Sequence, residues 1–254
     1  MRGALYLFLI ISVLIVSSCE VQEKVIVEET EQNVSTELLS YGNNYTGYLV
    51  SPKEEGIYPG IVMIHEWWGL NENIKDMAHD LAKEGYIVLA VDLYEGKVAD
   101  NPEYARIYST EARENSEKSI LQMKSAVSFL KEYSNGKVAS LGWCFGGGMS
   151  MQLSLNEDLD ATVIYYGTLV TDKEKLKSLK SPVLGIFGEE DTSITVSTVH
   201  EFESALDNLG IENEIYIYDG LGHAFANPSN PGHDKKSTKD AWIKTVGFLN
   251  NHLK

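Results

Sequence analysis

Short apolar runs alternate with segments of helical periodicity along most of this chain, and this alternation limits the possible folds more than any other feature. The runs 60–65 (Gly-Ile-Val-Met-Ile-His) and 86–93 (Tyr-Ile-Val-Leu-Ala-Val-Asp-Leu) are almost wholly apolar, which is typical of strands buried on both faces of a sheet. Between them, residues 73–84 carry apolar side chains at helical spacing and end at Gly85. Strands separated by helices form βαβ units, so the pattern predicts a mostly parallel sheet with helices on both faces.

The same patterns continue to the end of the chain. Further strands are expected at residues 45–50, 137–142, 162–166, 183–187 and 214–218, and helices within 102–133 and at about 146–155, 196–209 and 235–252. No internal repeat and no linker divides residues 37–254. We therefore predict one α/β domain over residues 37–254, which is within the usual size of such domains.

Residues 1–19 have the features of an export signal. One arginine precedes the apolar run Ala4–Val16, which is too short to cross a bilayer comfortably. The run leads into Val16-Ser17-Ser18-Cys19, which resembles the lipobox of bacterial-type lipoproteins, where the cysteine becomes the lipidated first residue. The resemblance implies an exported lipoprotein, anchored to a membrane through Cys19 and facing outside the cytoplasm. An ordinary cleaved signal or an uncleaved anchor is the alternative.

Composition narrows the remaining possibilities. Residues 20–36 are polar and rich in glutamate, so we expect a flexible tether, with the folded domain beginning near Glu37. The net charge of -16 argues against nucleic acid as a partner, because phosphate binding requires clustered lysine and arginine. Neither a Cys/His cluster nor a phosphate loop nor a dinucleotide fingerprint occurs in the sequence, so no metal or other cofactor is implied.

The segment Gly142–Gly148 (Gly-Trp-Cys-Phe-Gly-Gly-Gly) connects an expected strand to an expected helix. It contains G-x-C-x-G around Cys144, which is the nucleophile elbow of α/β-hydrolases with cysteine in place of serine. In such a turn the sulfur lies at the N-terminus of the following helix, where the helix dipole favours the thiolate. The backbone N–H of Phe145 can then donate to a developing oxyanion. A glycine turn that merely holds a buried cysteine is the alternative.

An acid and a base follow the elbow in the order found in α/β-hydrolases. Asp191 and His223 each come shortly after an expected strand. Ligands of open parallel sheets bind beyond the carboxyl ends of the strands, so we expect Cys144, Asp191 and His223 to meet there. Glu189 and Glu190 are the alternatives for the acid, and a surface loop is the alternative setting for His223.

A further strand end carries His65-Glu66-Trp67-Trp68-Gly69. The fold usually supplies its second oxyanion N–H at this place, and Trp67 is the candidate. Glu66 is a candidate to contact the resting thiol and accept its proton when substrate enters. His65 closes a buried strand, which favours a structural hydrogen bond over catalysis. Four other histidines have no metal-like partners, and no role is assigned to them: His79, His200, His233 and His252.

Four motifs together resemble the dienelactone hydrolases, also called carboxymethylenebutenolidases. They are His65–Asn71, Asp92-Leu93-Tyr94, Gly142–Gly147 and Gly222–Ala226. The likeness extends over roughly residues 37–254. It implies an α/β-hydrolase fold with a triad of Cys144, Asp191 and His223. It also implies a hydrogen bond between Glu66 and the thiol, through which Glu66 controls activation of the thiol, and backbone donors from Trp67 and Phe145.

The chain departs from the members of this family that act in chloroaromatic breakdown. Those enzymes hold the substrate carboxylate with one arginine soon after the Asp-Leu-Tyr motif and another soon after the His-Ala/Ser-Phe motif. Here Glu95-Gly96-Lys97 and Asn227-Pro228 stand at these places. Neither lysine nor asparagine reproduces the bidentate pairing of arginine with a carboxylate. The departure argues against dienelactone itself as the substrate.

From these residues we predict a hydrolase that cleaves a small carboxylic ester or lactone through a thioester acyl-enzyme, without a cofactor. An aromatic substrate pocket is expected from Trp68, Tyr94 and Phe225. Two alternatives remain. Other acyl chemistry on the same fold, by a peptidase or acyltransferase, would turn over amides or transfer the acyl group, whereas an idle, anchored binding protein would have no need of a complete triad.

Overall fold

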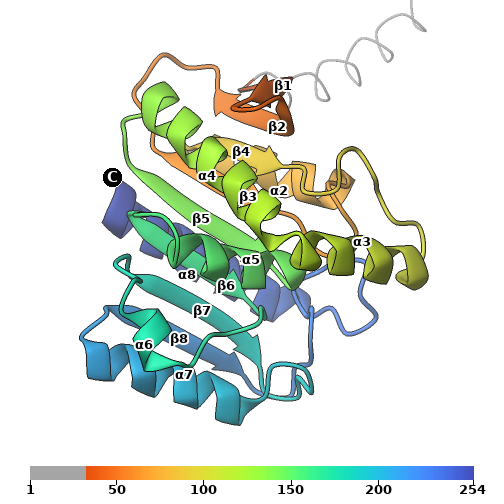
Figure 1. Ribbon diagram of the computed structural model, residues 1–254, viewed down its shortest axis with the longest axis vertical. Coiled ribbons are helices and arrows are strands. Elements are labelled where there is room, and N and C mark those ends of the chain that lie inside the picture. The colour runs from red at the N-terminus through yellow and green to blue at the C-terminus, as the bar shows by residue number, and fades with distance from the viewer. Residues whose placement is uncertain (1–32) are drawn as a thin grey trace, which may run out of the picture.

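Eight strands lie side by side in one sheet of the computed structural model, which describes residues 33–254 (Figure 1). Their order across the sheet is β1-β2-β4-β3-β5-β6-β7-β8. The strands are β1 (Val34–Tyr41), β2 (Tyr45–Pro52), β3 (Gly60–Ile64), β4 (Ile87–Val91), β5 (Val138–Trp143), β6 (Ala161–Tyr165), β7 (Val183–Gly188) and β8 (Asn213–Tyr218). The β1–β2 and β2–β4 pairs are antiparallel, and all other neighbours are parallel. The predicted α/β fold with a mostly parallel sheet is therefore confirmed.

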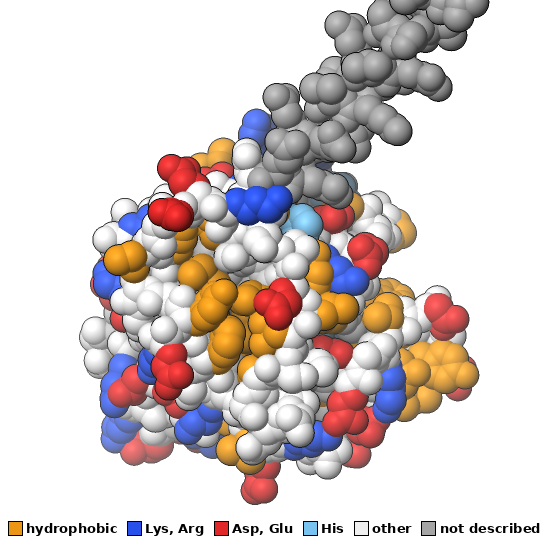
Figure 2. Space-filling view, turned by 90° about the horizontal axis from the view of Figure 1, so that it is seen from above, with side chains coloured by type: hydrophobic (Ala, Val, Ile, Leu, Met, Phe, Trp, Pro, Cys, Tyr) orange, Lys and Arg blue, Asp and Glu red, His pale blue; other side chains and the backbone are white. Residues whose placement is uncertain are grey.

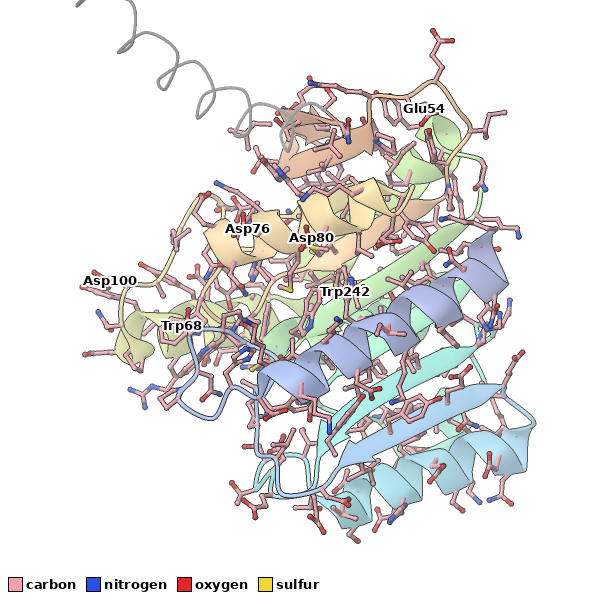
Figure 3. All side chains as sticks on the ribbon, turned by 180° about the vertical axis from the view of Figure 1, so that it is seen from behind. Glu54, Trp68, Asp76, Asp80, Asp100 and Trp242 are labelled. Carbon is pink, nitrogen blue, oxygen red and sulfur yellow. The ribbon has the colours of Figure 1, made fainter. Side chains whose placement is uncertain are left out.

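Helices cover both faces of this sheet. Helices α2 (Glu72–Lys83) and α8 (Lys235–Leu253) cover one face, which is turned toward the viewer in Figure 3. The opposite face carries α3 (Pro102–Glu114), α4 (Ser116–Tyr133), α5 (Phe145–Ser154), α6 (Lys173–Leu176) and α7 (Val196–Leu209). Within β3, Ile61 and Met63 pack on the α2 side, whereas Val62 and Ile64 pack on the α4 side. Burial on both faces explains why the central strands are continuous apolar runs.

Strand β1 begins at Val34, three residues before the expected start of the domain at Glu37. It pairs with β2 along its whole length, from Val34 opposite Pro52 to Tyr41 opposite Tyr45. Only the two end residues of β1 are buried, because the strand forms the edge of the sheet. An edge strand with so few buried side chains has little apolar periodicity, so the tether that we expected over residues 20–36 took in the first part of a strand.

The expectations for the N-terminus concern residues that the structure does not describe. The export signal at residues 1–19, the lipidation of Cys19 and most of the tether lie outside residues 33–254 and stay predictions. Among the described residues, no helix has the length and apolarity that a membrane span requires. Figure 2 shows the molecule from the top of the view in Figure 1. On that face acidic and basic side chains are intermixed, and neither sign is gathered in one area.

Candidate active site

Cys144 forms a one-residue turn between β5 and α5. Its backbone angles, φ 53° and ψ -114°, are rare for a residue with a side chain and mark a strained turn. A Cβ atom on Gly142 would lie 2.2 Å from the carbonyl oxygen of Gly146, and one on Gly146 would lie 2.3 Å from the carbonyl oxygen of Ile64. The close approach of these backbones requires glycine on both sides of Cys144, as the elbow pattern predicts.

Hydrogen bonds connect three side chains at the carboxyl ends of β5, β7 and β8. The Nε2 atom of His223 lies 3.2 Å from Sγ of Cys144, and its Nδ1 atom lies 2.6 Å from Oδ2 of Asp191. The other carboxylate oxygen of Asp191 accepts from the backbone N–H groups of Ser193 (2.8 Å) and Ile194 (3.0 Å). Because these two bonds fix the carboxylate, Oδ2 is directed at the imidazole.

The ionisation of this group follows from its contacts. Burial alone lowers the pKa of His223, but the hydrogen bonds to Asp191 and Cys144 outweigh it and raise the pKa to about 10. Burial raises the pKa of Asp191, yet the hydrogen bond from His223 and those from the backbone leave it below the ordinary value. Glu189 and Glu190, the alternatives for the acid, are exposed, and neither contacts His223. The structure thus places Asp191, and not its neighbours, beside the histidine.

Glu66 lies just beyond the end of β3 and is 2% exposed. Its Oε2 atom accepts a hydrogen bond from Nδ2 of Asn227, whose own Oδ1 atom accepts from the N–H of Ser229 at 2.8 Å. The second bond fixes the amide so that its NH₂ group faces Glu66. Burial raises the pKa of Glu66 to about 7, although the bond from Asn227 and the charge of His223 both lower it.

The contact that the resemblance implied between Glu66 and the thiol is not present. Within residues 33–254, the hydrogen bond of Glu66 is to Asn227, and that of Cys144 is to His223. The carboxyl of Glu66 is bound by the amide of Asn227 instead, and the thiol of Cys144 is bound by the imidazole of His223. In this conformation the sulfur is therefore already paired with the histidine.

A cleft of about 490 Å³ opens beside Cys144 and His223. It is lined by Glu66, Trp67, Trp68, Cys144, Ser193, His223, Ala224, Asn227, Ser229, Asn230 and Pro231. Trp68 was expected there, and Figure 3 shows it at the same end of the sheet as the loop that precedes α8.

Tyr94 and Phe225, which we also expected in the substrate pocket, do not line this cleft. Tyr94 is 4% exposed and borders a separate hollow of about 150 Å³. Phe225 has no exposed surface, and its ring packs against Tyr166 and Tyr218. Both aromatic rings contribute to packing beneath the site, so the prediction of a pocket made from them is wrong.

Two backbone N–H groups beside the cleft are free to bind a ligand. Trp67 lines the cleft and Phe145 is the first residue of α5, where an N–H has no partner inside the helix. Neither group has an acceptor among residues 33–254. The oxyanion role of these two groups stays a prediction.

His65, by contrast, has a hydrogen-bond partner at each ring nitrogen. Its Nε2 accepts from the N–H of Leu93 and its Nδ1 lies 2.6 Å from the Glu66 carbonyl oxygen, and burial lowers its pKa, as a structural, neutral histidine requires.

Tyr166 is a residue of the site that sequence reasoning missed. It follows β6 directly, is 1% exposed and has a positive φ of 35°. Its ring centroid lies 5.3 Å from that of His223, and its buried hydroxyl has no hydrogen-bond partner within the described part of the chain. Burial, followed by the charges of Glu66 and other neighbours including Cys144, raises its pKa well above the ordinary value. Its place directly after a central parallel strand was a signal that could have identified it.

Comparison with known proteins agrees with this architecture. The model of the dienelactone hydrolase family matches residues 45–253. The chain is 35% identical over 222 residues to the protein usf of Aquifex pyrophilus, which covers 84% of this chain and 95% of that protein. It is 31% identical over 223 residues to an Aquifex aeolicus protein provisionally named a carboxymethylenebutenolidase, covering 84% and 96% of the two chains.

A solved structure gives the same result. The crystal structure of a Klebsiella pneumoniae protein, provisionally named a dienelactone hydrolase, superposes with a TM-score of 0.74 and 25% identity. The match covers 85% of this chain and 98% of that one. Together with the family match over most of the chain, these likenesses assign the protein to a group of ester hydrolases on the α/β-hydrolase fold. We conclude that the chain belongs to the dienelactone hydrolase family.

Proposed function

We propose that this protein hydrolyses small carboxylic esters or lactones with Cys144 as its nucleophile. The observation that carries the proposal is the continuous chain of hydrogen bonds from Asp191 through His223 to Cys144, at the edge of a cleft that can admit a small substrate. A nucleophile, a base within hydrogen-bond reach and an acid that orients the base are the parts that covalent acyl transfer requires.

In the first half of the reaction, the proton that Cys144 and His223 share is on Nε2 of His223, whose pKa is raised to about 10, and the sulfur attacks the carbonyl carbon of the substrate. The electron pair of the C=O double bond moves to oxygen, and the N–H groups of Phe145 and Trp67 stabilise the resulting oxyanion. Collapse of this intermediate breaks the bond to the alcohol oxygen, which takes the proton from His223. A thioester on Cys144 remains. Each oxyanion donor is commonly worth about 3–4 kcal/mol in the transition state.

In the second half, His223 takes a proton from water, and the hydroxide attacks the thioester carbonyl. The second intermediate expels the sulfur, which again shares the proton on Nε2 of His223, and the carboxylic acid leaves. Asp191 orients the imidazole and stabilises its cationic form throughout. Because a thiolate leaves a tetrahedral intermediate more readily than an amide nitrogen does, the chemistry favours esters and lactones over amides.

The test uses the full chain carrying Cys19→Ala, so that Cys144 is its sole thiol. We expect iodoacetamide to modify Cys144 and to stop the hydrolysis of p-nitrophenyl acetate in proportion. Cys144→Ala in the same background should fold normally and lose about 10⁴-fold or more of the rate. Hydrolysis that survives loss of the thiol would overturn the proposal, and faster turnover of a matched p-nitroanilide would favour a peptidase.

We also propose that the protein is exported and anchored to a membrane through Cys19. The support is the sequence Val16-Ser17-Ser18-Cys19 after a short apolar run. Cells that express the full chain and receive a radioactive fatty acid should label the wild type but not Cys19→Ala. A Cys19→Ala protein that still incorporates the label would contradict lipidation at this residue.

A further inference from the structure

The cleft has no positive side chain other than His223. Among the described residues that line it there is no lysine or arginine. Moving a proton between Cys144 and His223 leaves the sum of their charges unchanged, and Asp191 adds one negative charge beside them. Glu66, when ionised, adds a second negative charge. The charges at the reacting end of the cleft therefore sum to a negative value in every such state.

A hydrogen bond from Asn227 holds the carboxyl of Glu66 at the reacting end of the cleft. Asn227 binds only its Oε2 atom, and within residues 33–254 the Oε1 atom has no hydrogen-bond partner. Asn227 has no freedom to turn its carbonyl toward the carboxyl, because that oxygen already accepts from the N–H of Ser229. Glu66 is nevertheless among the residues that line the cleft. A buried carboxyl with one unpaired oxygen thus faces the space that a substrate enters.

An anionic substrate group would be strongly disfavoured in such a cleft. It would lose its hydration, meet the carboxylate of Glu66 and find no lysine or arginine among the described residues that line the cleft. A neutral ester or lactone meets none of these penalties, and the apolar surfaces of Trp67 and Trp68 are suited to it. The charge of the substrate, and not only its size, should therefore decide what is hydrolysed.

We propose that Glu66, fixed by Asn227, makes this cleft selective for uncharged substrates, so that the substrate class is a neutral ester or lactone without a carboxylate. The inference rests on the proposed hydrolase activity and adds a specificity-determining residue to it. It predicts that discrimination against anions follows the ionisation of one carboxyl.

The pH dependence of this discrimination has a definite sign. Glu66 lies near His223 and near Tyr166, which follows β6, and it accepts from the amide of Asn227. Cys144 lines the same cleft. The pKa of His223 is raised to about 10 and that of Tyr166 lies well above its ordinary value, so neither changes charge near neutrality. Burial raises the pKa of Glu66 to about 7. Discrimination should therefore be weak below neutral pH and strong above it.

The experiment compares two esters that differ by one charge, meta-acetoxybenzamide and meta-acetoxybenzoate, on the full-length protein. Both carry the same acetyl group on leaving phenols of similar shape. We expect the ratio of kcat/KM, neutral over anionic, to rise about tenfold between about pH 6 and pH 8, as the like charge of Glu66 develops. Glu66→Gln should abolish this rise and leave the ratio low at both values.

Two further variants separate selectivity from a general loss of activity. Asn227→Ala removes a hydrogen bond that lowers the pKa of Glu66, so the midpoint of the ratio should move to higher pH. Glu174→Gln removes the same charge at an exposed position on α6, where the carboxylate pairs only with Lys177 among the described residues, and should leave the profile unchanged. A purely structural role of Glu66 and Asn227 would lower both rates together without moving the ratio.

The outcomes are distinct. If both esters are hydrolysed with a ratio that neither pH nor Glu66→Gln changes, the selectivity inference is overturned and the hydrolase proposal stands. A preference for the anionic ester by the wild type would also overturn it. If the wild type hydrolyses neither ester, the proposed function fails and the inference fails with it.

Discussion

Two groups of side chains at the cleft, here called its paired side (Cys144, His223 and Asp191) and its unpaired side (Glu66 and Tyr166), differ in how completely their polar atoms have hydrogen-bond partners. On one side, both nitrogens of His223 and both oxygens of Asp191 have partners, and the sulfur of Cys144 completes the chain. On the other side, among the described residues, Glu66 has a partner for only one oxygen, and the hydroxyl of Tyr166 has none. Buried groups without partners reduce stability, so they are expected where a ligand or a reaction makes use of them.

The comparison indicates that the two sides serve different needs. The paired side fixes the geometry of groups that exchange a proton, which is what preorganised catalysis requires. The unpaired side keeps a carboxyl and a hydroxyl buried without full pairing, and the backbone of Tyr166 also has a strained, positive φ. Variants on the paired side should therefore reduce both the rate and the stability, whereas variants on the unpaired side should increase stability.

The largest expected effect is that of Asp191→Asn on the paired side. The amide can keep the two backbone bonds of Asp191, but its NH₂ group is unable to accept the proton on Nδ1 of His223 and stabilises no charge. We expect kcat to fall by about 10³-fold or more, measured with p-nitrophenyl acetate, and the melting temperature to fall as well, because the variant loses the bond that raises the pKa of His223 and lowers that of Asp191. Glu190→Gln, on an exposed neighbour, is the control. A loss of less than tenfold would mean that Asp191 does not orient the histidine.

The paired side was predictable from the sequence because each of its residues comes shortly after an apolar run. Parallel strands end at one edge of the sheet, so Cys144, Asp191 and His223 were expected to meet, and the structure brings them together. The glycines of the elbow added a steric requirement that the sequence displays directly. Local pattern and chain order were sufficient here, since no loop conformation had to be known.

The unpaired side was predictable only in part, because Glu66 and Tyr166 both follow strands but their contacts left no pattern in the sequence. The contact of Asn227 with Glu66 joins residues far apart in the sequence and depends on how the loop before α8 folds. Aromatic composition suggested Tyr94 and Phe225 as pocket residues, but composition does not show which rings face the core. Strand β1 was missed for a related reason, because only its end residues are buried. The pattern of apolar residues along the sequence does not predict contacts that depend on how distant segments pack together.

The second prediction concerns Glu66→Gln and stability. Burial raises the pKa of Glu66 from 4.5 to about 7, so between these values the folded protein binds a proton that the unfolded chain has released. The free energy of unfolding therefore decreases as pH rises through this window, by about 3 kcal/mol from this group. Glutamine does not ionise, so Glu66→Gln lacks this decrease in stability with rising pH. Its side-chain oxygen can still accept the hydrogen bond from Asn227.

Urea unfolding at about pH 4.5 and pH 8 measures this effect. The stability of Glu66→Gln relative to the wild type should increase by about 3 kcal/mol between the two values. Glu174→Gln, on exposed α6, should show no such increase. If Glu66→Gln is less stable than the wild type at the higher pH, the carboxylate of Glu66 must have more hydrogen-bond partners than the one from Asn227, and the contrast between the two sides fails.

The smallest expected effect is that of Tyr166→Phe, and it tests whether an unpaired group on this side serves the reaction. Removing a buried hydroxyl without a partner should raise the free energy of unfolding by about 1 kcal/mol. Because the hydroxyl lies close enough to Cys144 and Glu66 to be influenced by their charges, its loss should also lower kcat/KM by about tenfold. Tyr41→Phe is the matched control, since the Tyr41 hydroxyl lies near Gln122 but makes no hydrogen bond and belongs to edge strand β1. Both variants should gain stability and only Tyr166→Phe should lose rate, whereas equal rates in the two would mean that the hydroxyl of Tyr166 is a packing defect that the reaction does not use.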